Sequence, residues 1–410
     1  MDEADLDLTE LPFGSNLTFM EDRKFDRGPQ IQLREPAEGP EPLYVTRPFL
    51  PPLNEYTKIL QGIWNRGILT NNGPLNYALE EKLEQFLGAP SVATISNGSL
   101  ALEMVLEAAQ LTGEVITTPY SFVATSHSIL RAGLTPVFVD IEDNGFNLNP
   151  ARVEEAITDR TSAILAVHCY GIPCDVDALA NIARRHKLTL IYDAAHAFGV
   201  RLEGRSLFSF GDYSTLSFHA TKVFHTFEGG AITVSDPAKR DRINSLRNFG
   251  ITSETTIPYI GTNAKLSEPS AAMGLLQLDY IDFVLSERAR VDRLYREGLA
   301  DIKGIYVPPI PDGVISNHSY FPILVTSDFP LSRDGLYEHL KSERIFTRRY
   351  FYPLLSSLPM YESLPSADPK RLHNASRASE QILCLPIYPL LSDSELQRVV
   401  CAIRRSSSHP

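Results

Sequence analysis

The stretch YSTLSFHATKVFHTFEGG, residues 213–230, decides how the rest of the sequence is interpreted. It begins with a β-branched and aromatic run, YSTLSF, which is typical of a strand, and it ends at Gly229 and Gly230, just before a second apolar run, AITVS. Lys222 lies in the turn between these two predicted strands. A lysine there is either a solvated surface charge or a desolvated amine that forms a Schiff base, and its neighbours decide between the two.

Two other stretches place polar groups at the ends of predicted strands. The apolar run LTLIY is typical of a buried strand and ends in Asp193, where open α/β sheets bind their ligands. The stretch SVATISNGSLALEMVLEAA predicts a strand, a turn at Asn97-Gly98-Ser99, and a helix. Since the first backbone N–H groups of a helix have no acceptor within it, this turn is a predicted anion site.

A lysine, a buried carboxylate and an anion site are together what pyridoxal phosphate requires. Lys222 would hold the aldehyde as an imine, and Asp193 would keep the pyridine nitrogen protonated so that the ring accepts electrons. The helix N-terminus would take the phosphate. The alternative is an α/β protein whose strands end in Asp and Lys without any such site.

Composition narrows the class of protein. The chain has 410 residues, 43% of them hydrophobic and 21% charged, as in ordinary globular proteins. Its net charge of -12 argues against nucleic-acid or membrane partners, and no apolar run is long enough for a membrane span. The acidic beginning MDEADLDLTE does not resemble a signal peptide, so we expect a cytoplasmic protein. The four cysteines form no Cys-x-x-Cys pair, and we expect reduced thiols and no metal site.

The order of the predicted elements indicates three parts. Residues 1–45 are acidic and without periodicity, which predicts a flexible arm. Residues 46–280 alternate strands and helices, which predicts a large α/β domain whose mainly parallel sheet is covered by helices on both faces. One long helical stretch through 261–299 would link it to a smaller α+β domain, residues 281–410. The last helix opens with a capping box, Ser392 to Glu395.

These motifs resemble the fold-type I pyridoxal phosphate enzymes and, within them, the DegT-like sugar-nucleotide aminotransferases. The resemblance covers about residues 46–400 and is carried by six blocks in order. They are LTNNGPL, SNGSLAL, TTPYSFVATSHSILRAGLTPVFVDI, YDAAHAFG, SFHATKVFHTFEGGA and GTNAKLSEPSAAMGL.

The resemblance implies roles for individual residues. Lys222 would bond to the cofactor and then carry the proton between substrate and cofactor carbons, and Asp193 would pair with the pyridinium. His196 would hydrogen-bond the phenolic oxygen of the cofactor, unless it is a structural histidine. Phe122 would stack on the pyridine ring, unless it belongs to the core.

Other implied residues bind the phosphate or the substrate. The backbone amides of Gly98 and Ser99 and the hydroxyl of Ser217 would hold the phosphate, and Asn263 would reach the phosphate of the second subunit in a homodimer with shared active sites. The resemblance also places three residues near the substrate, namely Asn72, Arg348 and Tyr350. In the segment RRYFYPL, Arg348 or Arg349 would bind a diphosphate or a carboxylate, unless both lie on a solvated edge.

The implied activity is amino transfer from L-glutamate to a nucleotide-linked keto-deoxy sugar, in deoxyamino sugar and polysaccharide biosynthesis. The blocks are most similar to enzymes that aminate carbon 4 of dTDP-4-keto-6-deoxyglucose. Alternatives are a carbon-3 keto-sugar aminotransferase, a pyridoxal phosphate-dependent sugar dehydratase, and a pyridoxal phosphate-binding regulator. Relatives that act as dehydratases carry histidine at the position of Lys222, which favours the transaminase.

Overall fold

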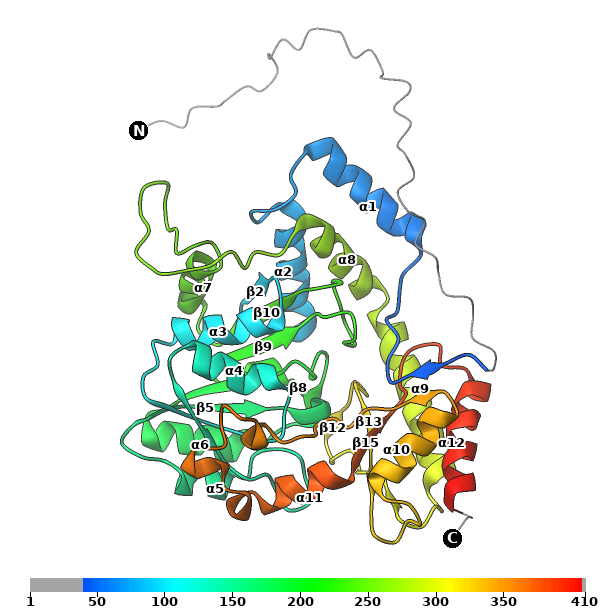
Figure 1. Cartoon of the computed structure of the whole chain (residues 1–410). Helices are drawn as coiled ribbons and strands as arrows, with labels where there is room; N and C mark the ends of the chain where they lie inside the picture. Colours follow the sequence, from blue (N-terminus) through cyan, green and yellow to red (C-terminus); the bar gives the residue numbers. More distant parts are fainter. Residues whose placement is uncertain (1–39, 408–410) are drawn as a thin grey trace. The chain divides into compact units, whose positions relative to one another are not determined.

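A seven-stranded sheet with the order β2-β10-β9-β6-β5-β3-β4 lies at the centre of the computed structural model, which describes residues 40–407 (Figure 1). Only β10 runs antiparallel to its neighbours within this sheet. The strands are β2 (Val92–Ile95), β3 (Glu114–Thr117), β4 (Thr135–Phe138), β5 (Thr161–Val167), β6 (Thr189–Asp193), β9 (Tyr213–Ser217) and β10 (Gly230–Val234). The predicted mainly parallel α/β sheet is confirmed.

Helices cover both faces of this sheet, because its strands alternate apolar side chains between the two faces. In β5, Ala163 and Leu165 belong to one core, whereas Ile164 and Ala166 belong to the other. The first core is covered by α3 (Gly98–Ala108), α4 (Val123–Arg131) and α7 (Arg240–Leu246). The opposite face is covered by α2 (Pro74–Leu87), α5 (Pro150–Glu155), α6 (Val176–His186) and α8 (Glu268–Asp279).

A further core forms in the C-terminal third of the chain around a three-stranded antiparallel sheet of order β11-β13-β15. Its strands are β11 (Ile305–Tyr306), β13 (Phe321–Val325) and β15 (Ile382–Leu385). Its helices are α9 (Ile281–Leu299), α10 (Arg333–Ser342) and α12 (Asp393–Ser407), whereas α11 (His373–Gln381) contributes Ala375 and Ala378 to a separate cluster. The remaining elements are α1 (Leu53–Arg66), β1 (Leu43–Tyr44), β7 (Arg201–Leu202), β8 (Arg205–Ser206), β12 (Val314–Ile315) and β14 (Ile345–Phe346).

The predicted capping box of the last helix is confirmed. The Glu395 backbone N–H donates to the Ser392 hydroxyl, and the Ser392 backbone N–H donates to the Glu395 carboxylate. The predicted single helix through 261–299 is wrong in two respects. The segment 261–267 is not helical, since α8 begins after the Ser267 N-cap, and Tyr280 separates α8 from α9.

The structure describes only the last six residues of the predicted arm, residues 40–45. Residues 1–39 of the predicted arm lie outside the described residues. Leu43 and Tyr44 form β1, which pairs with β14, so they belong to the fold rather than to an arm. Residues 41–410 group as one compact unit, and the division near residue 280 stays a prediction. No helix within residues 40–407 combines the length and the apolar character that crossing a membrane requires.

A buried ion pair fixes the sheet edge that leads to the predicted anion site. Arg247 donates to the Glu80 carboxylate at 2.6 Å and to the carbonyl oxygen of Thr94 in β2 at 2.8 Å. The backbone carbonyl of Arg247 accepts from Ala264, whose own carbonyl accepts from Ser96. Because both charges are buried, their mutual pairing is what makes this arrangement tolerable. The pair therefore holds β2, and the turn that follows it, in place.

Candidate active site

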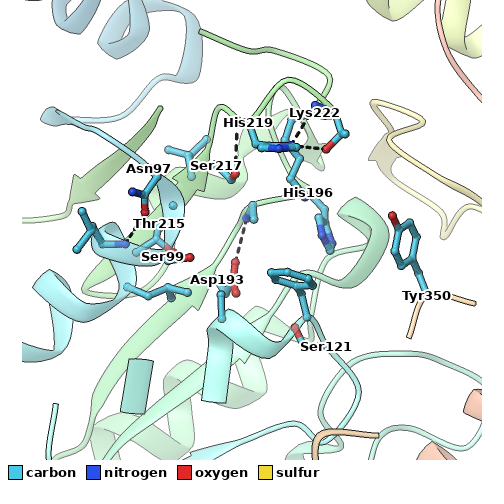
Figure 2. A pocket seen from close by; sticks show the side chains of 18 of the residues that line it. Asn97, Ser99, Ser121, Asp193, His196, Thr215, Ser217, His219, Lys222 and Tyr350 are labelled. Carbon is cyan, nitrogen blue, oxygen red and sulfur yellow. Dashed lines mark hydrogen bonds between the residues drawn. The ribbon is translucent and has the colours of Figure 1, made fainter. Parts of the chain in front are cut away.

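A cavity of about 670 Å³ opens at the carboxyl ends of the parallel strands. Figure 2 shows Asn97 and Ser99 on one side of it, Tyr350 on the other, and Asp193, His196 and Lys222 between them. The predicted site residues that line it are Gly98, Ser99, Phe122, Asp193, His196, Ser217, Lys222 and Tyr350. Residues that are far apart in the sequence therefore meet in one cavity.

Lys222 lies in the loop between β9 and β10, enclosed by protein but open to the cavity. Its Nζ atom lies 3.3 Å from the hydroxyl oxygen of Tyr320. Burial lowers the pKa of Lys222 to about 8, while the negative charge of Asp193 opposes this shift. Near neutral pH the side chain is therefore mainly an ammonium with a substantial amine fraction, which a nucleophilic lysine requires.

Asp193, the last residue of β6, is buried at the base of the cavity. Its Oδ2 atom accepts a hydrogen bond of 2.8 Å from the Thr125 hydroxyl, and its Oδ1 atom accepts from the Ala195 backbone N–H at 3.2 Å. Burial raises the pKa of Asp193, and these hydrogen bonds oppose that rise. A buried carboxylate with only neutral donors in direct contact suits a cationic partner such as a protonated pyridine nitrogen.

His196 is buried and follows Asp193 by three residues. The Tyr170 backbone N–H donates to its Nδ1 atom at 3.2 Å, so the neutral ring carries its proton on Nε2. Burial, with the nearby charge of Lys222, holds the pKa of His196 well below its usual value. The ring is therefore a neutral hydrogen-bond donor at physiological pH.

The predicted anion site has the form of a backbone cradle. Asn97 caps α3 by accepting from the Leu100 N–H at 2.9 Å, which leaves the N–H groups of Gly98 and Ser99 in the unpaired first turn. A Cβ atom at Gly98 would lie 2.9 Å from the Cβ of Ser217, and one at Gly230 would lie 2.9 Å from the Gly98 nitrogen. Because Gly98 and Gly230 have no side chain, the ends of β2 and β9 and the start of β10 can approach one another closely. The resulting cradle of backbone N–H groups fits a phosphate group.

Phe122 and the Arg348–Tyr350 segment line or approach the mouth of the cavity. Phe122 precedes α4 and exposes 57% of its surface, so it is available to stack on a ring and is not a core residue. Arg349 forms an ion pair of 2.7 Å with Asp334 and lies 3.7 Å from the centre of the Tyr337 ring. Arg348 is exposed and does not line the cavity.

Asn72 and Asn263 also lie outside the cavity lining. Asn72 precedes α2 and accepts from the Asn76 side chain at 3.2 Å. Asn263 is exposed, and its Oδ1 atom accepts from Lys265 at 2.8 Å. Their predicted contacts with substrate and with a second subunit stay predictions.

Two residues of the site were missed by sequence reasoning, Thr125 and Tyr320. Because the Thr125 hydroxyl donates its proton to Asp193, it accepts the 2.9 Å hydrogen bond from the Ser121 hydroxyl. It lies within the block TTPYSFVATSHSILRAG, which could have drawn attention to it. Tyr320 lies 98 positions after Lys222 and had no such signal.

Comparison with known proteins decides the family. Residues 53–404 match the model of the DegT/DnrJ/EryC1/StrS aminotransferase family. The chain belongs to this family. It is an aminotransferase that uses pyridoxal phosphate, and the lysine, carboxylate and cradle described above fit that cofactor.

Two similar proteins are transaminases that act in amino-sugar formation, as their names state. The chain is 50% identical over 365 residues to the dTDP-4-amino-4,6-dideoxy-D-glucose transaminase of Shigella dysenteriae, covering 89% of this chain and 99% of that one. It is 48% identical to the enzyme of the same name from Escherichia coli, covering 87% of this chain and 96% of that one. The solved structure of DesI in the presence of its TDP-sugar product superposes with a TM-score of 0.87 at 37% identity, covering 91% and 95% of the two chains.

We expect the Thr125 hydroxyl to set the strength of cofactor binding through Asp193. Thr125→Val removes a hydrogen bond to a buried carboxylate, and such bonds contribute about 1.5–3 kcal/mol, so pyridoxal phosphate should bind at least about tenfold more weakly. Thr125→Ser keeps the hydroxyl and should stay within about twofold of the wild type. Titration of the apoprotein with cofactor measures both, and equal affinities for all three proteins would contradict the assignment.

Proposed function

We propose that this enzyme transfers an amino group from L-glutamate to carbon 4 of dTDP-4-keto-6-deoxyglucose, giving dTDP-4-amino-4,6-dideoxyglucose. The observation that carries the proposal is the 50% identity with the Shigella dysenteriae transaminase across nearly the whole of both chains. The cavity also has room for a cofactor and a sugar, at about 670 Å³.

Bound pyridoxal phosphate supplies an electron sink that stabilises negative charge at the carbon bearing the amino group. Lys222 carries the proton between the two carbons that exchange it, because its lowered pKa leaves an amine available near neutral pH. Asp193 holds the pyridine nitrogen protonated, and His196 donates from Nε2 to the phenolic oxygen. The amine, the carboxylate and the imidazole all border the same cavity, which supports these roles.

Further residues hold the phosphate of the cofactor and one face of its pyridine ring. The backbone amides of Gly98 and Ser99 and the hydroxyl of Ser217 bind its phosphate, and Phe122 stacks on its ring. Gly98, Ser99 and Ser217 come together at the N-terminus of α3, which supports placing the phosphate there.

The substrate enters from the side of Tyr350 and Arg348. Arg349 is already engaged by Asp334 and Tyr337, whereas Arg348 makes no side-chain hydrogen bond or ion pair within residues 40–407. We therefore assign the diphosphate or the glutamate carboxylate to Arg348. Asn72 completes the substrate contacts from the loop before α2.

The enzyme works as a homodimer in which Asn263 of one subunit reaches the phosphate in the other. Large apolar side chains are exposed on α1 and on the segment before Asn263, which supports an interface there. Leu53 is 76% exposed, Trp64 70%, Ile257 64% and Ile260 93%. The four cysteines are all free, which supports a cytoplasmic location, where thiols remain reduced.

A panel of keto-sugar nucleotides tests the substrate directly. With L-glutamate as donor, the proposal predicts amination of dTDP-4-keto-6-deoxyglucose with a kcat/KM at least about a hundredfold above that for carbon-3 keto sugars. The product is identified by mass and by NMR of the carbon that carries nitrogen. Preferential amination of a carbon-3 ketone, or loss of an oxygen without gain of nitrogen, would support one of the two alternative reactions instead.

Mixed dimers test the shared active site. Lys222→Ala and Asn263→Asp should each be inactive, the first through loss of the amine and the second through repulsion of the phosphate. In a dimer of the two, one active site holds both defects and the other holds neither, so random mixing of subunits should restore about one quarter of wild-type activity. Co-expression of the two variants and an activity assay of the unfractionated mixture measure this. A mixture that remains as inactive as its parents would contradict the sharing.

A further inference from the structure

The side chains of Tyr320 and Lys222 form a hydrogen bond with each other. Among residues 40–407, the Lys222 amine makes one hydrogen bond, to the Tyr320 hydroxyl at 3.3 Å, and that hydroxyl makes no other. The amine also lies 5.8 Å from the centre of the Tyr320 ring. None of the roles assigned above uses this tyrosine, although it borders the cavity.

The backbone on either side of Tyr320 is held firmly. It directly precedes β13, and the buried guanidinium of Arg288 in α9 donates to the carbonyl oxygens of His318 and Ser319 at 3.2 and 3.4 Å. The Ser319 hydroxyl donates to the carbonyl oxygen of Tyr170 at 2.8 Å. The position of the Tyr320 backbone is thus fixed both by the C-terminal part of the chain and by the loop after β5.

The ring of Tyr320 is held by aromatic neighbours. Its centre lies 4.8 Å from that of His196 and 5.6 Å from that of Tyr350, both nearly edge to face. Edge-to-face pairs at such distances are favourable and restrict ring rotation. The hydroxyl therefore keeps its position toward Lys222 through contacts that do not depend on the lysine.

The phenol suits either protonation state of the lysine. Burial raises the pKa of Tyr320 far above its ordinary value, so the phenol stays neutral. A neutral hydroxyl accepts a hydrogen bond from an ammonium and donates one to an amine. Since the pKa of Lys222 is about 8, both forms of the lysine occur under working conditions.

We propose that Tyr320 is a positioning residue that orients the Lys222 amine whenever this lysine is not covalently linked to the cofactor. This inference rests on the proposed role of Lys222 as the proton carrier. The hydroxyl restricts the amine to the side of the cavity that Tyr320 and Tyr350 border. It thereby keeps the lysine ready to move the proton and, when free pyridoxal phosphate binds, to form an imine with its aldehyde with loss of one water.

The test is the rate at which the apoprotein captures pyridoxal phosphate as a function of pH, followed by visible absorbance. Capture needs the amine form, so its rate rises with pH through the lysine pKa. In Tyr320→Phe the ammonium loses the Tyr320 hydroxyl as an acceptor, and because hydrogen bonds to charged groups are the stronger ones, the midpoint of the rate profile should move about half a pH unit or more downward. The plateau rate should fall about tenfold, because the amine is no longer oriented.

Two controls separate orientation from structural damage. Tyr295→Phe removes a buried hydroxyl that has no partner in the described part of the chain and whose ring contacts Phe321, so its capture profile should match the wild type. Pyridoxamine phosphate, which forms no bond with lysine, should bind Tyr320→Phe as tightly as the wild type. An unchanged capture profile in Tyr320→Phe, or an equal weakening of pyridoxamine phosphate binding, overturns the proposal.

The capture assay contains no sugar and no glutamate. A failure to aminate the dTDP-linked sugar would therefore contradict the proposed function while leaving this result unaffected. Conversely, a normal profile in Tyr320→Phe would remove the positioning role and leave the sugar activity as proposed.

Discussion

Enclosure of the Lys222 amine close to the charge of Asp193 is the interaction on which the site depends. Burial favours the neutral amine, whereas the carboxylate favours the ammonium, and the balance places the pKa of Lys222 at about 8. A solvated lysine would remain an ammonium at neutral pH and would be a poor nucleophile. The residues that line the cavity, among them the packed rings of Tyr320, His196 and Tyr350, maintain this enclosure.

The strand order explains how residues distant in sequence reach this cavity. β6 and β9 are neighbours, with Asp193 paired to Thr215, so the carboxylate lies beside the strand that leads to Lys222. Gly230 pairs with both Ile95 and Ser217, which brings the β2–α3 turn against the end of β9. One sheet edge thus holds the carboxylate, the amine and the phosphate cradle.

Sequence reasoning found Asp193 and Lys222 from the strands they follow, but it missed Tyr320 and Thr125. Asp193 and Lys222 follow apolar runs, so their position at one sheet edge could be predicted. Tyr320 comes from the segment before β13, and nothing in its local sequence indicates contact with Lys222. The break at Tyr280 was also missed, because apolar periodicity continues across it and only backbone geometry reveals it.

The visible spectrum of the protein with pyridoxal phosphate, before and after L-glutamate, tests the central claim most directly. The claim is that Lys222 is bonded to the cofactor and that L-glutamate, the amino donor, displaces the lysine from it. In the wild type, glutamate should remove the visible band of the lysine-bound cofactor, and Lys222→Ala should not show this loss. The absence of a visible band in the wild type, or the same loss in Lys222→Ala, would contradict the account.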